Sequence, residues 1–359
     1  MGKIRLAIVG VGNCASSLIQ GIYYYKGKAG KEFISGVMHN EIGGYRIDDI
    51  EPVAAFDVDA GKVGKDLSEA IFAAPNNTVK TAKVPKLGVT VMMGSVLDGI
   101  GEYMSSVISV SPDKNANVAK VLKDSKVDVV VNFLPVGSAK ATRFYAEEAI
   151  KAGCGFVNAI PEFIASDAAW EKKFRDARLP VIGDDTKSQV GSTIVHRVLT
   201  DLCKNRGAVI DHTYQLNVGG NSDFKNMLER ARLKSKKISK TEAVQSQMRA
   251  RLEDDDIHVG PSDYVPWLDS RKLGFIRIEG RLFGDVPFNI ELRLDVEDKA
   301  NSSGVVIDAI RCCKVAMDKK IGGALVSPSS YFCKHPPQQF ADSDAQKMTE
   351  EFIAGKRER

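Results

Sequence analysis

The first fifteen residues constrain the fold more strongly than any other segment. Residues 4–9, IRLAIV, have the composition of a buried parallel strand, and a glycine-containing turn joins them to a helical pattern. In G-x-G-x-x-A, the first glycine permits a tight turn, the second lets the backbone approach a pyrophosphate, and the small third residue allows close helix packing. The sequence therefore predicts a dinucleotide-binding turn made by Gly10, Gly12, Asn13, Cys14 and Ala15. The alternative is a plain tight turn.

Short buried strands alternate with helical segments over the first two hundred residues. The predicted strands cover residues 53–56, 127–133, 156–159 and 180–182, and predicted helices cover 16–25, 141–153 and 192–203. Each strand ends in a polar residue or a glycine turn, which predicts an α/β fold with a Rossmann-like, doubly wound parallel sheet. A stretch rich in Gly and Lys, residues 26–49, is expected to be a surface loop.

The pattern changes to period two beyond about residue 208. Apolar side chains alternate with polar ones at 212–218, 275–281 and 288–296, which predicts half-buried strands of a mostly antiparallel sheet, covered by helices such as 241–252. We expect a Rossmann-like domain at 1–205, a second α+β domain at 206–310, and a C-terminal segment, 311–359, that returns to the first domain. The charged end, residues 347–359, is expected to fray.

Composition excludes several classes of protein. Charged residues are 27% and hydrophobic residues 43%, as in ordinary soluble domains, and 50 basic against 46 acidic side chains leave +4, too little to indicate a nucleic acid or an anionic membrane. No apolar run approaches the roughly 18 to 20 residues of a membrane-spanning helix, and no signal peptide is recognisable. Six dilute cysteines favour reduced thiols over a disulfide framework. The expected location is the cytoplasm.

Polar residues at strand ends are candidates for cofactor contacts. Asp57 follows the second strand, where an acidic side chain usually accepts the adenosine ribose hydroxyls, and its charge would favour NAD over NADP. Capping of the next turn by Asp57 or Asp59 is the alternative. The later strand ends supply candidates for the nicotinamide crevice: Asn132, Pro135, Ser138 and Asn158.

Two segments are suited to binding a phosphate. Residues 183–193, GDDTKSQVGST, concentrate hydroxyls, amides and a lysine before a helix, although helix capping alone explains such residues. Residues 230–240 hold the densest positive charge of the chain. That run is either a solvated helix face or a lysine pocket for a small phosphorylated substrate.

Four separated motifs carry a resemblance to a known family. They are NVGGNSDF at 217–224, LKSKKISKTEAV at 233–244, GDDTKSQ at 183–189 and VEDKANSSGVVIDAIRC at 296–312. With them the chain resembles myo-inositol-1-phosphate synthase in its short prokaryotic form, over nearly its whole length. The resemblance implies an isomerase of inositol and phospholipid biosynthesis that converts glucose 6-phosphate to 1L-myo-inositol 1-phosphate. Bound NAD would oxidise C5, enolisation and an intramolecular aldol step would close the ring, and the ketone would then be reduced.

The resemblance also assigns residues by position. Lys236, Lys240 and Lys334 match family lysines and would be catalytic. Lys272 would be the fourth catalytic lysine, unless Arg271 occupies that position. Asp185, the acidic member of the GDDxKS segment, would be catalytic and would also contact the cofactor, and Asp298 would face the nicotinamide or a lysine. Three residues would hold the substrate phosphate, although Ser-Gln-Val-Gly departs here from the eukaryotic Ser-Gly-Gln-Thr order: Lys187, Ser188 and Gln189.

The resemblance further implies a homotetramer, with the second domain contributing to catalysis and assembly, and a mono- or divalent cation near the phosphates. No His, Cys or carboxylate cluster has ligand spacing for a metal, and Cys312 and Cys313 are expected to be packing residues. Two other functions stay open at this point. One is an NAD(P)-dependent dehydrogenase or reductase of the semialdehyde or dipicolinate-reductase type, and the other is a non-catalytic NAD sensor.

Overall fold

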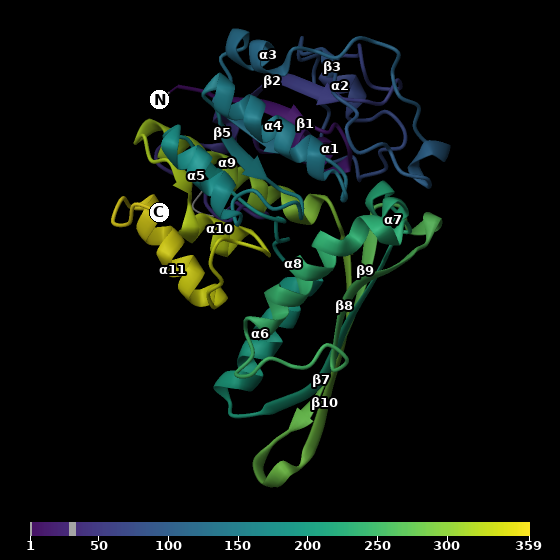
Figure 1. The fold of residues 1–359 in the computed structure, drawn as a ribbon, viewed down its shortest axis with the longest axis vertical. Coiled ribbons are helices and arrows are strands. Elements are labelled where there is room, and N and C mark those ends of the chain that lie inside the picture. The colour runs from purple at the N-terminus through teal and green to yellow at the C-terminus, as the bar shows by residue number, and fades with distance from the viewer. Residues whose placement is uncertain (1, 29–33) are drawn as a thin grey trace.

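A computed structural model describes residues 2–28 and 34–359 and contains two β-sheets with helices packed around them (Figure 1). The larger sheet is parallel throughout and has the strand order β11-β6-β5-β4-β1-β2-β3. Its strands are β1 (Ile4–Val9), β2 (Ile50–Asp57), β3 (Val91–Met93), β4 (Val129–Asn132), β5 (Gly155–Asn158), β6 (Pro180–Ile182) and β11 (Gly323–Ala324). The predicted doubly wound sheet is confirmed. Strand order reverses between β1 and β4, the place where such sheets bind ligands.

Strand β1 is buried on both faces because helices cover both sides of the sheet. Leu6 and Ile8 pack into one apolar cluster with α1 and α9, whereas Ala7 and Val9 pack into another with α3 and α4. Helix α4 ends at Gly153, whose φ of +80° suits a left-handed C-cap. The covering helices are α1 (Asn13–Tyr25), α2 (Leu67–Ala70), α3 (Val118–Asp124), α4 (Ala139–Ala152), α5 (Ala168–Asp176), α9 (Ala300–Asp318), α10 (Val326–Phe332) and α11 (Asp342–Ile353). No helix in the described part of the chain is long and apolar enough to cross a bilayer.

The second sheet has the order β10-β9-β7-β8 and is antiparallel except for the β7–β8 pair. Its strands are β7 (Val209–Gly219), β8 (Ile257–Tyr264), β9 (Arg271–Arg281) and β10 (Pro287–Glu297), and the helices beside it are α6 (Ser192–Asn205), α7 (Ser222–Asn226) and α8 (Lys234–Gln245). The expected mostly antiparallel sheet is confirmed. The helix predicted at 241–252 was placed too late, because two lysines on the buried face of α8 interrupt its apolar periodicity.

Helix α9 crosses the expected boundary between the second domain and the C-terminal segment. The expected boundary at residue 310 falls inside this helix, whose buried residues join the core cluster around α1 and β1. We therefore propose that the second domain ends near residue 299. After α9, strand β11 pairs with β6 at the edge of the larger sheet.

Two expectations about the surface were wrong. The stretch 26–49 is not a simple surface loop, since Ile34, Ile42 and Ile47 are buried in the core, while residues 29–33 lie outside the described residues. Buried Arg311 of α9 holds this stretch by donating to the backbone carbonyls of three of its residues, which are His39, Asn40 and Tyr45. The charged end does not fray as expected either, because α11 reaches residue 353 and buries Phe352.

Ile42 tests this packing, because its side chain is fully buried. Ile42→Ala should lower the free energy of unfolding by about 2–5 kcal/mol through lost contacts and the cavity left behind. Glu41→Ala is the matched control, because Glu41 is the adjacent residue. Its side chain is exposed and makes a surface ion pair with Arg46 at 3.9 Å. Thermal unfolding measures both. Equal midpoints for the two variants would show that this stretch does not belong to the core.

Candidate active site

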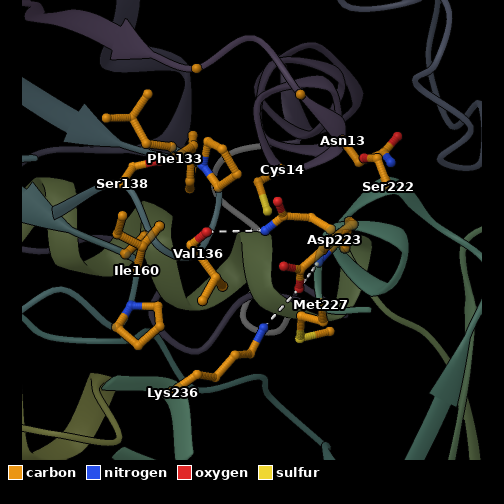
Figure 2. A pocket seen from close by; sticks show the side chains of 18 of the residues that line it. Asn13, Cys14, Phe133, Val136, Ser138, Ile160, Ser222, Asp223, Met227 and Lys236 are labelled. Atoms are coloured by element: carbon orange, nitrogen blue, oxygen red, sulfur yellow. Dashed lines mark hydrogen bonds and ion pairs between the residues drawn. The ribbon is translucent and has the colours of Figure 1, made fainter. Parts of the chain in front are cut away.

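A pocket of about 280 Å³ opens where the carboxyl ends of β1, β2 and β4 face the helices of the second sheet. Side chains from both parts of the fold point into it, among them Cys14, Ser138, Asp223 and Lys236 (Figure 2). The pocket thus joins the glycine turn to the lysine-rich helix α8, which are more than two hundred residues apart in the sequence.

The glycine turn forms one wall of this pocket. Gly10 has a φ of +88°, and a Cβ there would lie 2.8 Å from the Phe133 carbonyl oxygen, so only glycine fits. A Cβ on Gly12 would meet no atom within 4 Å. Gly12 is also the N-cap of α1 and provides no side-chain cap, so the first backbone N–H groups of that helix are available to an anion. Ala15 is buried behind the turn and packs in the core, as its small size predicts.

Asp57 lies at the end of β2 and lines the pocket beside this turn. One carboxylate oxygen accepts from the Val11 N–H at 2.7 Å, and the other accepts from the N–H groups of Val58 and Asp59 at 2.7 and 2.9 Å. The carboxylate therefore holds the turn in place. Because a carboxylate has about four acceptor positions, a ligand hydroxyl could still bind to it.

Five lysines and three aspartates line the opposite end of the pocket. Formally, five positive charges against three negative ones leave 5 − 3 = +2. The ion pairs are Lys334–Asp185 at 2.7 Å, Lys299–Asp298 at 2.9 Å, Lys236–Asp223 at 3.0 Å, Lys272–Asp298 at 3.4 Å and Lys299–Asp223 at 3.5 Å. Among the residues that the structure describes, no carboxylate lies within 4.0 Å of the Lys240 ammonium group. The cluster can therefore attract an anionic ligand and retain one unpaired amine.

The two pocket lysines of α8 come from adjacent turns of one helix face. Lys236 and Lys240 are four residues apart and both are buried, whereas Lys234 and Lys237 point to solvent. Between the buried pair, the Ser239 hydroxyl donates to Asp185 at 2.7 Å. The dense positive segment therefore has two faces. Helical spacing directs two of its lysines into the pocket and two into solvent.

The surroundings shift the pKa values of these groups in different directions. Burial lowers the pKa of Lys240 well below its usual value, and the ammonium groups of Lys236 and Lys272 lower it further. Burial likewise lowers the pKa of Lys272, with Asp298 opposing the shift. Lys299 differs, because the carboxylates of Asp298 and Asp223 outweigh its burial and raise its pKa. Lys240 is therefore the best candidate for a neutral amine.

Neighbouring lysines lower the pKa values of the carboxylates in the cluster. Burial would raise the pKa of Asp185, but Lys334 and Lys236 more than offset it and lower the value. The pKa of Asp298 is also lowered, because Lys299 and Lys272 outweigh burial. All these carboxylates are therefore ionised at neutral pH, and they compensate the lysine charge.

Most residues selected from the sequence line this pocket, and some do not. The selected residues on its wall are Gly10, Gly12, Asn13, Cys14, Asp57, Pro135, Ser138, Asp185, Ser188, Lys236, Lys240, Lys272, Asp298 and Lys334. Lys272, not Arg271, faces the pocket, because Arg271 points outward and pairs with Asp295. Asn132 and Asn158 lie behind the wall and hydrogen-bond to each other at 2.9 Å.

Lys187 and Gln189 also point away from this pocket. The Lys187 ammonium donates to the Ser330 carbonyl and to Asp342, both at 2.8 Å, and the Gln189 amide donates to the Gly36 carbonyl at 3.1 Å. Because neighbouring residues of an extended loop face opposite sides, only Ser188 of the three expected phosphate contacts reaches the pocket.

Sequence reasoning missed two charged members of the cluster. Asp223 lies in the quoted NVGGNSDF motif and Lys299 follows Asp298, so both were within motifs already singled out. Asn221 also orients the cluster, since its amide donates to Asp298 at 3.1 Å.

The described part of the chain contains no group of three His, Cys, Asp or Glu side chains that could hold a metal ion. Its cysteines are free, and Cys312 and Cys313 are packed in the core.

Comparisons with known proteins agree with one another. The family model described as myo-inositol-1-phosphate synthase matches residues 191–299. An inositol-3-phosphate synthase of Mycolicibacterium smegmatis is 56% identical over 99% of both chains, and one of Corynebacterium glutamicum is 53% identical over 98% of both. A solved myo-inositol-1-phosphate synthase-related protein from Thermotoga maritima has a TM-score of 0.80 at 23% identity, covering 99% of this chain and 100% of that one, and shares the fold.

The two glycines of the turn should respond differently to alanine. Gly10→Ala should lower the thermal unfolding midpoint by several degrees, because it adds a close contact to a strained backbone. Gly12→Ala should leave the midpoint nearly unchanged but weaken NAD binding at least tenfold in calorimetry, because the new methyl group enters the pocket. Unchanged NAD affinity in Gly12→Ala would contradict a pyrophosphate position at this turn.

Proposed function

The chain belongs to the myo-inositol-1-phosphate synthase family, and from this premise we propose how its pocket converts glucose 6-phosphate to inositol 1-phosphate. The observation that carries the proposal is the unpaired, buried Lys240 among four other lysines, in the same pocket as a dinucleotide turn. A sensor would not need this cluster, whereas a reaction through enolate and alkoxide charge does.

We propose that NAD occupies the end of the pocket formed by the glycine turn. The open space at Gly12 and the N-terminus of α1 suit its pyrophosphate, and Asp57 suits the adenosine ribose. When bound, NAD would supply a hydride acceptor and later the hydride donor. Pro135 and Ser138 follow β4 on the pocket wall and suit contacts with the nicotinamide half.

The substrate phosphate would lie at the N-terminus of α6. Ser188, Ser192 and Thr193 line the pocket there, and the N-cap residue Gly191 has no side chain to occupy the helix N–H groups. The lysines of the cluster outnumber its aspartates by five to three, which favours an anionic ligand such as a phosphate monoester. This position replaces the earlier expectation for Lys187 and Gln189, whose side chains point elsewhere.

Lys240 would act as the general base of enolisation. A lysine with a depressed pKa contains more neutral amine at neutral pH and can accept a proton from carbon beside a ketone. Lys236, Lys272 and Lys334 would stabilise oxygen atoms that gain negative charge. Their partners Asp185, Asp223 and Asp298 keep each ammonium group oriented.

We further propose that the enzyme works in the cytoplasm as a homotetramer and feeds inositol phospholipid synthesis. The second sheet is available for assembly, since Leu282, Phe283 and Val286 at the β9–β10 hairpin are exposed, Phe283 by 99%. A mono- or divalent cation near the phosphates would compensate part of their negative charge.

The overall reaction is tested with purified protein, glucose 6-phosphate and catalytic NAD. Phosphorus NMR should show an inositol phosphate while absorbance shows no net NADH, because the hydride is returned. Net NADH without a cyclised product would instead indicate a dehydrogenase. No reaction despite NAD binding would indicate another substrate or a sensor.

The role of Lys240 is tested by Lys240→Arg, which keeps the positive charge but cannot become neutral. We expect kcat to fall by about 10²–10⁴-fold with NAD binding retained. Lys237→Arg, on the exposed face of the same helix, should retain kcat within about twofold. In the unmodified enzyme, kcat should fall as pH is lowered through the depressed pKa of Lys240, since only the neutral amine accepts a proton. Full activity of Lys240→Arg would refute this role.

A further inference from the structure

Arg197 of α6 is a fully buried arginine that does not line the active-site pocket formed by the described residues. Each of its three guanidinium nitrogens nevertheless has a partner. The acceptors are Asp342 at 2.8 Å, the Ala243 carbonyl at 2.5 Å, the Phe340 carbonyl at 2.9 Å, Ser246 at 3.1 Å and Gln339 at 3.2 Å. A buried charge with this many directed bonds determines the relative positions of the segments that supply the acceptors.

The first of these segments is the lysine helix α8. Ala243 is in the last turn of α8, where carbonyl groups lack partners within the helix, and a cation there is also favoured by the helix dipole. Lys240 precedes Ala243 by three residues. The bond from Arg197 therefore ties the C-terminal end of α8, one turn after Lys240, to α6.

The second segment carries Lys334. Gln339 accepts from Arg197 and, through its amide nitrogen, donates to the Lys334 carbonyl at 2.7 Å. The Lys334 backbone N–H in turn donates to the Asp185 carbonyl at 2.7 Å, beside the ion pair of the two side chains. Arg197 is thus connected to Lys334 through one intervening side chain.

The third segment is the loop that carries Ser188. Asp342, at the start of α11, binds Arg197 with one oxygen and Lys187 with the other. Because Lys187 precedes Ser188, this bridge holds the loop in the orientation that turns Ser188 into the pocket. The two buried cations are therefore joined through one carboxylate, with both ion pairs at 2.8 Å.

We propose that Arg197 is a positioning residue that aligns Lys240, Lys334 and the Ser188 loop for the reaction. The inference rests on the proposed function, because it assigns those three parts to one catalytic event. A displacement of about 1 Å in such a constellation can cost about 10²-fold in rate. Lysine could keep the charge at this position, but its three N–H donors sit on one nitrogen and cannot replace five bonds made from three separate guanidinium nitrogens.

The test compares full-length Arg197→Lys with the unmodified enzyme in the inositol phosphate assay. We expect kcat to fall at least tenfold, while KM for glucose 6-phosphate changes less than about threefold and NAD affinity stays within twofold. Arg251→Lys is the matched control. Arg251 follows α8 and makes a bidentate ion pair with Glu242, which lies on the exposed side of that helix. That variant should retain kcat within twofold.

A second variant keeps the inference testable if Arg197→Lys does not fold. Gln339→Ala removes the link between Arg197 and the Lys334 carbonyl, together with a 3.5 Å bond from Ser246, at a partly exposed position. It should lower kcat about three- to tenfold with an unchanged unfolding midpoint. Normal kcat in Gln339→Ala and in folded Arg197→Lys would overturn the inference. An equal fall in kcat for Arg251→Lys would do so as well. Absence of product from the unmodified enzyme would instead refute the proposed function.

Discussion

The active site depends on holding five lysine side chains together in a buried pocket. Like charges repel most strongly where water is excluded, so the arrangement requires carboxylates placed among them. Asp185 follows β6, Asp223 lies in α7, and Asp298 follows β10, so the compensation comes from three separate parts of the chain. The pocket therefore exists only where the two sheets meet, and neither part of the fold could hold the lysine cluster alone.

The same compensation differentiates lysines that are chemically identical. Lys299 lies between two aspartates and its pKa is raised, whereas Lys240 has lysine neighbours and no carboxylate within ion-pair distance among the described residues, so its pKa is lowered. One cluster can thereby contain both a proton acceptor and stable cations. The dinucleotide turn at the other end completes the pocket, because strand order reverses between β1 and β4 and leaves the crevice open.

Much of this arrangement could be predicted from local sequence patterns. Alternating strands and helices indicated the parallel sheet, and the glycine turn indicated the dinucleotide end. The four-residue spacing of Lys236 and Lys240 placed both on one helix face once α8 was located. Helix α8 itself was misplaced, since buried lysines look polar in a sequence. The stretch 26–49 was expected to be a surface loop because it is rich in Gly and Lys, although isoleucines at 34, 42 and 47 are buried.

The sequence by itself determined the alternation of strands and helices that indicates the parallel sheet, the glycine turn, the family resemblance and the candidate lysines, because these depend on residue type and spacing along the chain. Only the tertiary structure decided that Lys272 and not Arg271 faces the pocket, that Lys187 is bound to Asp342 behind it, and that Asp223 and Lys299 complete the cluster. Charge interactions depend on distance and burial in three dimensions, and residues more than a hundred positions apart come together only when the chain folds.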